Sequence, residues 1–401
     1  MRVLSLAMAI AIGLVASAVS GSGWAEDKPI KVALIADKTG PLEAYAKQTS
    51  AGFALGLEYA TKGTNTVAGR KIEVIEKDSQ TKPDVGRALL AEAYTDDGAD
   101  LAVGGTSSAV ALAMLPVAQD NKKVFIVEPA VADAITGEKW NRYIFRTGRD
   151  STQDAISNAL AIGKPDTVVA TLGQDYAFGR DGVAAFKKAI EPTGGKVVFE
   201  EYAPPTTTDF TAPLQRVIDA LDKEKGRKIL WVIWAGGNPF PAIKGANLPA
   251  HGIEVATGGN ILPALAAYKD FPGLEGATYY YYEIPKNPVN DWLVTDNKKR
   301  NGGVPPDFFT AGGFSAAMAA VTALEKTKGN TDTETLIKAM EGMDFQTPKG
   351  KMIFRREDHQ ALQSMYAFKI KVDPNVAWAI PELTKELSID DLKIPVGNIP
   401  K

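Results

Sequence analysis

The turn Gly104-Gly105-Thr106-Ser107-Ser108 has the residue types of an anion-binding site. It follows the apolar run 101–103 and precedes the helix-forming run 109–115, so a strand passes into a helix here. The first N–H groups of a helix have no partner within it, glycine lets a ligand approach the backbone, and hydroxyl groups can donate to a carboxylate or phosphate. The simpler interpretation is that Ser107 or Ser108 only caps the helix. The surrounding chain favours the binding site.

The first 25 residues have the pattern of a secretory signal peptide. Arg2 precedes an apolar run over 4–18, and small residues lead to Ala25 before the charged residues that start at Glu26. The apolar run is short for a membrane span, and no stop-transfer charges follow it. We expect export to the periplasm with cleavage after Ala25. We expect no later stretch to be long and apolar enough to cross a bilayer, so the mature protein should be soluble.

Composition excludes several kinds of function. The net charge is −3, and no basic stripe indicates nucleic acid as a partner. The chain has no cysteine and only two histidines, His251 and His359, so no disulfide, zinc cluster or Ser-His pair is expected. We expect no cofactor and no metal.

Strand and helix patterns alternate from residue 30, which predicts an α/β fold with a parallel sheet covered on both faces. In the first part, the strands are expected at 30–36, 72–75, 101–103 and 124–127, with helices at 46–60, 83–94 and after Ser108. Ligands bind beyond the carboxyl ends of such strands. The loops expected at that edge are 37–45, 78–81, 104–108 and 128–132.

The alternation begins again after residue 146 and predicts a second lobe. Its helices are expected at 151–161, with Ser151 as N-cap, and at 182–190, 210–221 and 239–246; its strands are expected at 167–171, 196–201, 229–234, 253–256 and 277–282. Loops 173–179, 235–240 and 258–263 should then face the cleft. Three later helices are expected, at 289–298, 314–326 and 333–340. They are too many to cover the second sheet alone, so we assign some of them to the first lobe. Two lobes that share one chain through several crossings make a hinge and a cleft.

Several motifs occur in the order and spacing of one known family. They are 35–42 (IADKTGPL), 69–73 (GRKIE) ending in 78–80 (DSQ), 105–108 (GTSS), 129–130 (PA), 143–147 (YIFRT), 175–179 (DYAFG) and 347–350 (TPKG). Over essentially the whole mature chain the sequence resembles the periplasmic solute-binding proteins of branched-chain amino acid ABC transporters, with an aromatic-acid-binding branch as an option. The resemblance implies a type I periplasmic-binding-protein fold of two Rossmann-like lobes with three hinge crossings. It places 26–146 and 284–350 in lobe 1, and 147–283 and 351–401 in lobe 2.

In lobe 1 the resemblance implies five ligand-site residues. Tyr45 becomes a wall of the pocket, and Phe309 corresponds to a pocket aromatic. Ser107 and the backbone at Ala130 become the clamp for a ligand carboxylate. Ala132 stands where the family often has threonine or serine, so a side-chain donor is missing there. Without the resemblance to this family, Tyr45 or Phe309 could equally be an ordinary aromatic residue of the core.

In lobe 2 the resemblance implies that Tyr176 closes over the ligand and that Trp234 is an aromatic at a strand end. Asn260 occupies the position that is usually acidic in amino-acid binders. Trp234 could instead fill the core. The run 279–282 of four tyrosines is interpreted most simply as a strand whose end could reach the cleft. Arg146 is interpreted as a structural hinge ion pair rather than a carboxylate partner.

These patterns predict a receptor that captures a small carboxylate and delivers it to the membrane permease of an ABC transporter, working as a monomer. One alternative is a sensor domain that reports the ligand to a membrane protein. An α/β enzyme is the other, but there is no Gly-x-Ser-x-Gly elbow, no phosphate loop and no histidine beside a nucleophile. The chain is therefore expected not to be an enzyme.

The type of carboxylate follows from the loop 257–263, which carries no charge. A buried ligand ammonium needs an acidic partner, and the neutral amide of Asn260 cannot supply one. The expected aromatic side chains suit a flat ring. We therefore favour an aromatic or other amino-free organic acid over a branched-chain amino acid. Glu128 is the residue that could overturn this preference, if it turned into the cleft.

Overall fold

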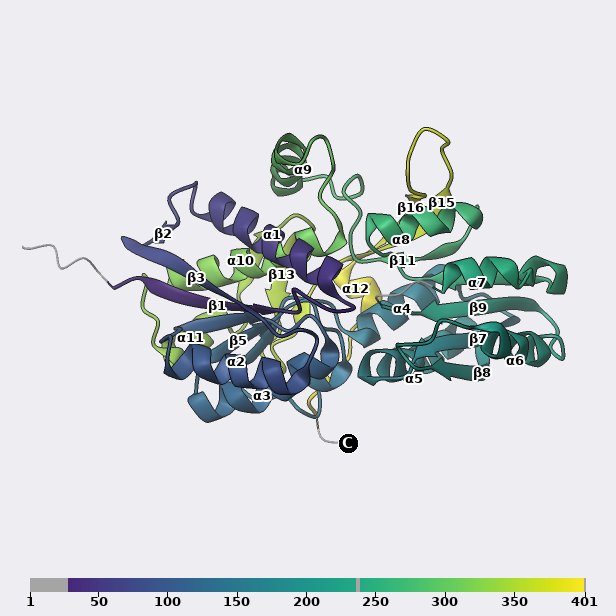
Figure 1. Ribbon diagram of the computed structural model, residues 1–401, viewed down its shortest axis with the longest axis horizontal. Helices are drawn as coiled ribbons and strands as arrows, with labels where there is room; N and C mark the ends of the chain where they lie inside the picture. The colour runs from purple at the N-terminus through teal and green to yellow at the C-terminus, as the bar shows by residue number, and fades with distance from the viewer. Residues whose placement is uncertain (1–27, 236–238, 400–401) are drawn as a thin grey trace, which may run out of the picture.

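The computed structural model describes residues 28–235 and 239–399. The expected signal peptide and its cleavage site lie outside these residues. The elements form two lobes side by side along the long axis of the molecule (Figure 1). Each lobe has a central sheet with helices on both faces, as the alternating pattern predicts.

The first lobe is built on a six-stranded sheet in the order β2-β3-β1-β4-β5-β6, and the pairs from β3 to β6 are parallel. The strands are β1 (Ile30–Ala36), β2 (Thr66–Val67), β3 (Arg70–Asp78), β4 (Leu101–Gly104), β5 (Val124–Val127) and β6 (Ile144–Arg146). The helices are α1 (Glu43–Ala60), α2 (Pro83–Thr95), α3 (Ser108–Asn121), α9 (Pro288–Arg300), α10 (Phe308–Lys326) and α11 (Thr333–Met340).

Alternate residues of β1 enter different cores because successive side chains of a strand point to opposite faces. Val32 and Leu34 pack in the cluster that includes α1 and α10. Ala33 and Ile35 pack with α2 and α3 on the other face. Helices α10 and α11 pack in the core of the first lobe, which confirms that the late helices do not all belong to the second sheet.

Helix α10 corrects the expectation that no later stretch is apolar enough to span a membrane. Within the part of the chain that the structure describes, it alone has the length and hydropathy for a span. The helix lies in the core of the first lobe, with 89% of its apolar window buried. It packs along α1 so closely that a Cβ added at Gly52 would stand 2.0 Å from the carbonyl oxygen of Thr310.

The second lobe is built on a seven-stranded sheet in the order β16-β15-β11-β10-β9-β7-β8. The strands are β7 (Thr167–Gln174), β8 (Lys196–Ala203), β9 (Arg227–Ile233), β10 (Ile253–Thr257), β11 (Glu275–Thr278), β15 (Met365–Lys371) and β16 (Ile380–Leu387). The pairs β11–β15 and β15–β16 are antiparallel, and the other pairs of this sheet are parallel. Helices α4 (Ser151–Ile162) and α5 (Ala177–Ile190) cover one face, and α6 (Thr211–Leu221), α7 (Phe240–Gly245) and α8 (Leu262–Ala267) cover the other.

The chain first crosses between the sheets after β6 and again after β11, as expected, but the third change of sheet comes later than residue 350. A three-stranded antiparallel sheet of β12 (Asp344–Thr347), β13 (Gly350–Phe354) and β14 (Ala361–Leu362) lies next to the first lobe, where Gln360 forms a bridge with Arg146. The third crossing therefore falls between β14 and β15. Gly350 lies in the β12–β13 hairpin and not at a crossing.

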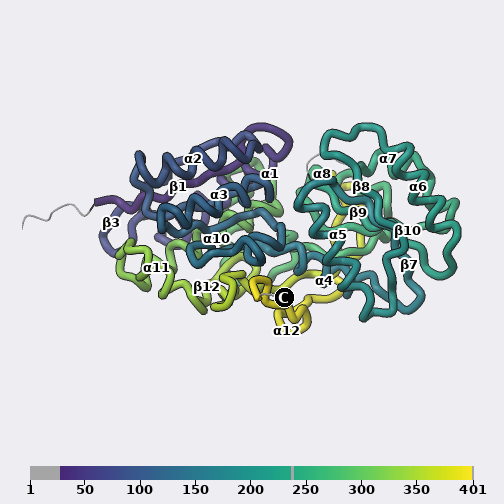
Figure 2. The backbone as a smooth tube through the Cα atoms, turned by 90° about the horizontal axis from the view of Figure 1, so that it is seen from below, coloured from purple at the N-terminus to yellow at the C-terminus, as the bar shows by residue number. Residues whose placement is uncertain are grey.

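After β16 the chain returns to the first lobe, through the short helix α12 (Ile389–Leu392). The guanidinium of Arg355 donates hydrogen bonds to the carbonyl oxygens of Ile394 (2.6 Å) and Pro395 (2.8 Å). The N–H of Gly397 donates to Asp358 (3.1 Å). The C-terminal segment 394–399 thus lies at the waist between the lobes, where Figure 2 shows it in yellow.

Two local expectations were wrong. Helix α4 is capped by Asp150 rather than by Ser151, because Asp150 and Gln153 form a reciprocal capping box. The tyrosine run 279–282 does not continue β11, which ends at Thr278. The run is instead the start of the second crossing, and three of its four side chains are nonetheless buried.

Candidate ligand-binding site

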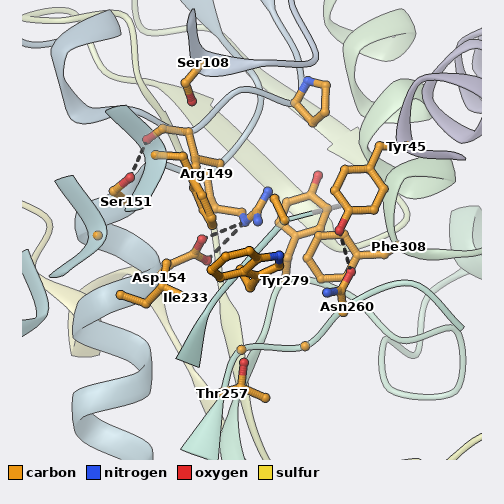
Figure 3. A pocket seen from close by; sticks show the side chains of 18 of the residues that line it. Tyr45, Ser108, Arg149, Ser151, Asp154, Ile233, Thr257, Asn260, Tyr279 and Phe308 are labelled. Carbon is orange, nitrogen blue, oxygen red and sulfur yellow. Dashed lines mark hydrogen bonds and ion pairs between the residues drawn. The ribbon is translucent and has the colours of Figure 1, made fainter. Parts of the chain in front are cut away.

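A cavity lies between the two lobes, with about 900 Å³ of empty space that includes its opening to solvent. The wall is built from the ends of β4, β5, β9 and β10, the N-terminal turns of α1, α4, α5 and α10, and the two nearby crossings (Figure 3). Six of the eight residues expected at the site line it: Tyr45, Ala130, Tyr176, Trp234, Asn260 and Phe309.

The 104–108 turn lies at the cavity, but its geometry differs from the expectation. A Cβ on Gly104, whose φ is +139°, would stand 1.9 Å from the carbonyl oxygen of Ile35, so only glycine fits. Ser107 is the N-cap of α3, and its N–H donates to the carboxylate of Asp37 (2.8 Å). Asp37 therefore already occupies part of this helix N-terminus, and burial raises its pKa. The Ser107 side chain is not among those that line the cavity.

Thr106 and Ser108 line the cavity on either side of Ser107. The Thr106 hydroxyl accepts a hydrogen bond from the N–H of Asp37 (3.2 Å), and the Ser108 hydroxyl accepts one from the N–H of Ala132 (3.2 Å). Each hydroxyl thus keeps its own proton for another acceptor. Ala132 is fully buried and does not line the cavity, and its contact with the wall is the backbone hydrogen bond to Ser108. In the sequence, Ser108 belonged to the predicted anion-binding turn, but the carboxylate clamp was assigned to Ser107.

Aromatic side chains from both lobes form much of the wall. The rings of Tyr45 and Phe309 lie 4.3 Å apart. The Tyr45 hydroxyl donates to Oδ1 of Asn260 (3.1 Å), which joins α1 of the first lobe to the loop after β10 of the second. Trp234 lines the cavity and also packs edge-on against Phe210 in the core, so its two interpretations are compatible.

Arg149 and Asp154 are the charged residues that the sequence analysis missed. Both line the cavity, and Nε of Arg149 lies 3.1 Å from each carboxylate oxygen of Asp154. Arg149 follows the first crossing and Asp154 lies in the first turn of α4, so a hinge position was the available signal. Burial raises the pKa of Asp154, and the neighbouring guanidinium opposes that shift.

Glu128 does not line the cavity. Its Oε2 accepts a hydrogen bond from the hydroxyl of Thr147 (2.8 Å), and its side chain packs against Gly312 of α10. Burial raises the pKa of Glu128 to about 7. Lys349 lies near it, donates to Gln363 (2.6 Å), and has its pKa lowered by burial. Glu128 thus does not supply the charge that the cavity loop 257–263 lacks.

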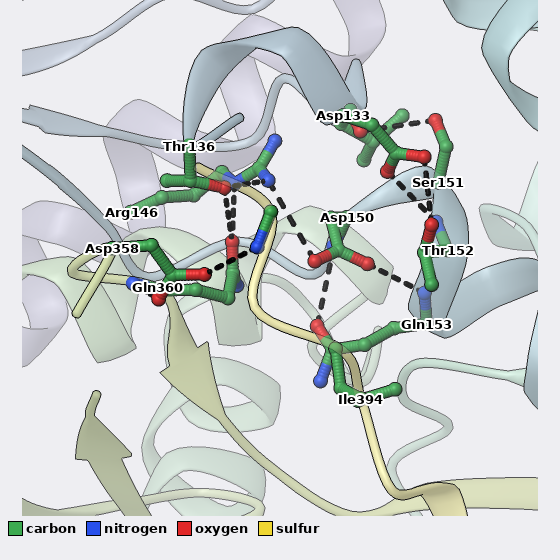
Figure 4. Close-up of polar contacts among 12 residues, drawn as sticks. Asp133, Thr136, Arg146, Asp150, Ser151, Thr152, Gln153, Asp358, Gln360 and Ile394 are labelled. Atoms are coloured by element: carbon green, nitrogen blue, oxygen red, sulfur yellow. Dashed lines mark hydrogen bonds and ion pairs between the residues drawn. The ribbon is translucent and has the colours of Figure 1, made fainter. Parts of the chain in front are cut away.

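Arg146 has the structural role expected from its position in a crossing strand (Figure 4). The side chain is fully buried. Its Nε donates to Gln360 (2.6 Å), Nη1 donates to the carbonyl oxygen of Ala132 (2.7 Å), and Nη2 donates to Thr136. Every nitrogen of this guanidinium is therefore used within the hinge.

A model of the periplasmic binding protein family matches residues 29–375. The chain belongs to this family. Its members serve ABC transporters as extracytoplasmic solute-binding proteins, which bind small molecules and work with membrane permeases. The resemblance inferred from the motifs is therefore confirmed, and so is the type I fold.

The relatives of this periplasmic binding protein include a Leu/Ile/Val-binding protein homologue of Brucella abortus, 25% identical over 84% of this chain and 86% of the relative. A crystal structure from Rhodopseudomonas palustris CGA009, described as an ABC-type branched-chain amino acid transporter, is 68% identical over 92% of this chain and all of that chain, with a TM-score of 0.83. A solute-binding protein from Rhodopseudomonas palustris BisB5, solved in complex with 3,4-dihydroxybenzoic acid, is 30% identical over 91% of this chain and 98% of that chain, with a TM-score of 0.78.

Proposed function

We propose that this protein captures a small carboxylate without an amino group, with an aromatic acid as the favoured ligand, and delivers it to the permease of its ABC transporter. The ligand is bound between the lobes as they close and is released chemically unchanged. The protein works as a periplasmic monomer after removal of its signal peptide. The proposed site consists of the eight expected residues, of which Ser107 and Ala132 do not line the cavity, together with Thr106, Ser108, Arg149 and Asp154.

One observation carries the preference for an amino-free ligand. Among the described residues that line the cavity, Asp154 is the only acid, and both of its oxygens face Arg149. An α-ammonium group buried here would have to compete with the guanidinium for that carboxylate. At the position of Asn260 it would meet only an amide.

The aromatic wall supports a ring in the ligand. Tyr45, Tyr176, Trp234 and Phe309 offer flat surfaces at which a second ring gains stacking in addition to burial. The BisB5 relative, which binds 3,4-dihydroxybenzoic acid, covers nearly the same length of chain.

Branched-chain amino acids are the second candidate. The relative at 68% identity is described as a branched-chain amino acid transporter, and a Pseudomonas aeruginosa relative, 26% identical over 81% of this chain, binds leucine, isoleucine, valine, threonine and alanine. For these ligands the Arg149–Asp154 pair would have to separate.

A thermal-shift panel tests the proposal, because a ligand stabilises the folded protein by RT ln(1 + [L]/Kd). The panel contains benzoate, 4-hydroxybenzoate and cinnamate against leucine, isoleucine and valine. We expect a higher unfolding temperature with at least one aromatic acid, and recovery of that acid unchanged after incubation. Stabilisation by the amino acids alone would overturn the ligand assignment, and turnover of any compound would overturn the receptor assignment.

Closure is tested separately by small-angle scattering. Ligand groups that contact both lobes favour the closed state by their differential affinity. We expect a smaller radius of gyration at saturating ligand. An unchanged radius would contradict binding by closure.

A further inference from the structure

We propose that Arg149 is the charged partner of the ligand carboxylate and that Asp154 positions it; this inference rests on the proposed function, because it requires a carboxylate ligand. The resemblance to the family assigned the carboxylate to the 104–108 turn and to the backbone at Ala130. In this structure two backbone donors of that clamp are already in use, because Asp37 accepts the N–H of Ser107 and the carbonyl oxygen of Gly105 accepts the N–H of Ala130. Thr106 and Ser108 line the cavity with neutral hydroxyls.

The guanidinium of Arg149 has one occupied edge and one open edge. Asp154 accepts from Nε, at 3.1 Å to each of its oxygens. Within residues 28–235 and 239–399, neither terminal nitrogen of Arg149 is in a hydrogen bond, although the side chain is only 11% exposed. The two terminal nitrogens form a fork whose geometry matches the two oxygens of a carboxylate.

Arg146, three residues earlier, shows what a purely structural arginine looks like in this hinge. All three of its side-chain nitrogens donate to protein acceptors, and the side chain does not line the cavity. Arg149 lines the cavity and has acceptors on one edge only. The terminal nitrogens of Arg149 thus lack the protein acceptors that those of Arg146 have, and a ligand carboxylate in the cavity can supply them.

Aromatic rings hold the guanidinium in place. Its central carbon lies 5.0 Å from the centre of the Phe308 ring, 5.6 Å from that of Tyr279 and 6.0 Å from that of Phe309. These distances are within the range of cation–π attraction. Figure 3 shows Arg149 reaching toward Tyr279 and Phe308 from the side of Asp154. The open edge is thus preorganised beside the surfaces on which an aromatic ligand would stack.

The other charged groups near Arg149 do not replace it. Glu128 and Lys349 are buried behind the wall and do not line the cavity. Burial shifts the pKa of each toward its neutral form. Arginine keeps its charge when buried, so Arg149 is the cation that stays available to an anion in the cavity.

The inference assigns distinct roles to the polar groups of the cavity. Arg149 binds the negative charge of the ligand carboxylate, and the hydroxyls of Thr106 and Ser108 add neutral hydrogen bonds. The protein should therefore distinguish benzoate from benzamide, which has the same shape but no charge, and this preference should depend on Arg149.

Calorimetric titration of benzoate and benzamide tests the assignment with four variants of the full mature chain. In Arg149→Gln we expect benzoate affinity to fall about 30-fold or more, as is typical when a desolvated charge-assisted pair is lost. Benzamide affinity should change far less, so that the preference for benzoate collapses. Arg149→Lys should restore part of the preference, because it restores the charge without the fork. Asp154→Asn should retain the preference, because it leaves the guanidinium charged.

The matched control is Arg180→Gln, because Arg180 is an exposed arginine that pairs with Asp175 and does not line the cavity. It should bind both compounds as the unmodified protein does. If Arg149→Gln binds benzoate within threefold of the unmodified protein, the assignment is wrong. Should Arg149→Gln fail to fold, the preference of Arg149→Lys for benzoate over benzamide decides. If that preference equals the preference of the unmodified protein, the assignment is wrong.

Failure of the proposed function would look different. If the unmodified protein binds leucine and not benzoate, the amino-free ligand is wrong, and the same variants titrated with leucine and leucinamide then test Arg149 as the carboxylate partner. If it binds none of these compounds, both proposals fail.

Discussion

Replacement of Glu128 by glutamine should stabilise the protein at neutral and alkaline pH. Glu128 is 1% exposed, and burial raises its pKa from 4.5 to about 7. Each tenfold change in an acid constant corresponds to 1.36 kcal/mol, so the ionised carboxylate destabilises the folded state by roughly 3 kcal/mol above pH 7. Glutamine has nearly the same shape, keeps an acceptor for the Thr147 hydroxyl, and has no charge to desolvate.

The pH dependence gives the sign of the effect. Between pH 4.5 and pH 7 the folded state holds a proton on Glu128 that the unfolded state has lost, so this group lowers stability as the pH rises. The increase in the free energy of unfolding caused by Glu128→Gln should therefore be near zero at pH 4 and should reach its full value by pH 8. For a chain of this length, roughly 3 kcal/mol corresponds to about 4 °C in unfolding temperature.

Thermal unfolding of the two proteins from pH 4 to pH 8, without ligand, measures this difference. Glu138→Gln is the control, because Glu138 is exposed, and its replacement should leave the unfolding temperature nearly unchanged across the range. A difference between Glu128→Gln and the unmodified protein that stays constant with pH would refute the argument. So would a difference that grows toward acid pH.

Three further substitutions test the packing and the contacts between the lobes. Tyr45→Phe removes the hydrogen bond to Asn260 and should weaken ligand binding about two- to tenfold in calorimetry, because a typical hydrogen bond contributes about 0.5–1.5 kcal/mol; unchanged affinity would show that this contact does not support the bound state. Arg146→Met leaves buried acceptors unpaired and should lower the free energy of unfolding by about 3–5 kcal/mol in urea titration. Gly52→Ala places a methyl group against the Thr310 carbonyl and should destabilise by about 1–3 kcal/mol in the same assay, whereas an unfolding midpoint equal to that of the unmodified protein would contradict the close helix contact.

The sequence was sufficient for the fold because hydrophobic periodicity and family motifs both report on local structure. The strand Val124–Val127 and the helix Thr333–Met340 have the bounds that their patterns predict. Helix α10 begins six residues before its predicted start, because Asp307 caps it ahead of the apolar run.

The site was less predictable, because its key contacts join residues far apart in the chain. The Ser107 hydroxyl and the Ser108 hydroxyl are indistinguishable in sequence, and only the approach of Asp37 to the Ser107 N–H separates their roles. Likewise, Arg146 and Arg149 are both arginines of the first crossing. The acceptors of the Arg146 guanidinium come from three places in the chain, and one of them, Gln360, is more than two hundred residues away.

The return of the C-terminal segment to the first lobe bears on the use of this protein as a biosensor. A fluorescent reporter fused after residue 399 would be held at the waist by Arg355 and Asp358, close to the crossings about which we propose that the lobes close. Points near a rotation axis move least, so such a fusion would report ligand weakly. A pair of dyes on the distant ends of the lobes, for example on the β2–β3 hairpin and at the start of β8, would convert the same rotation into a larger change in distance.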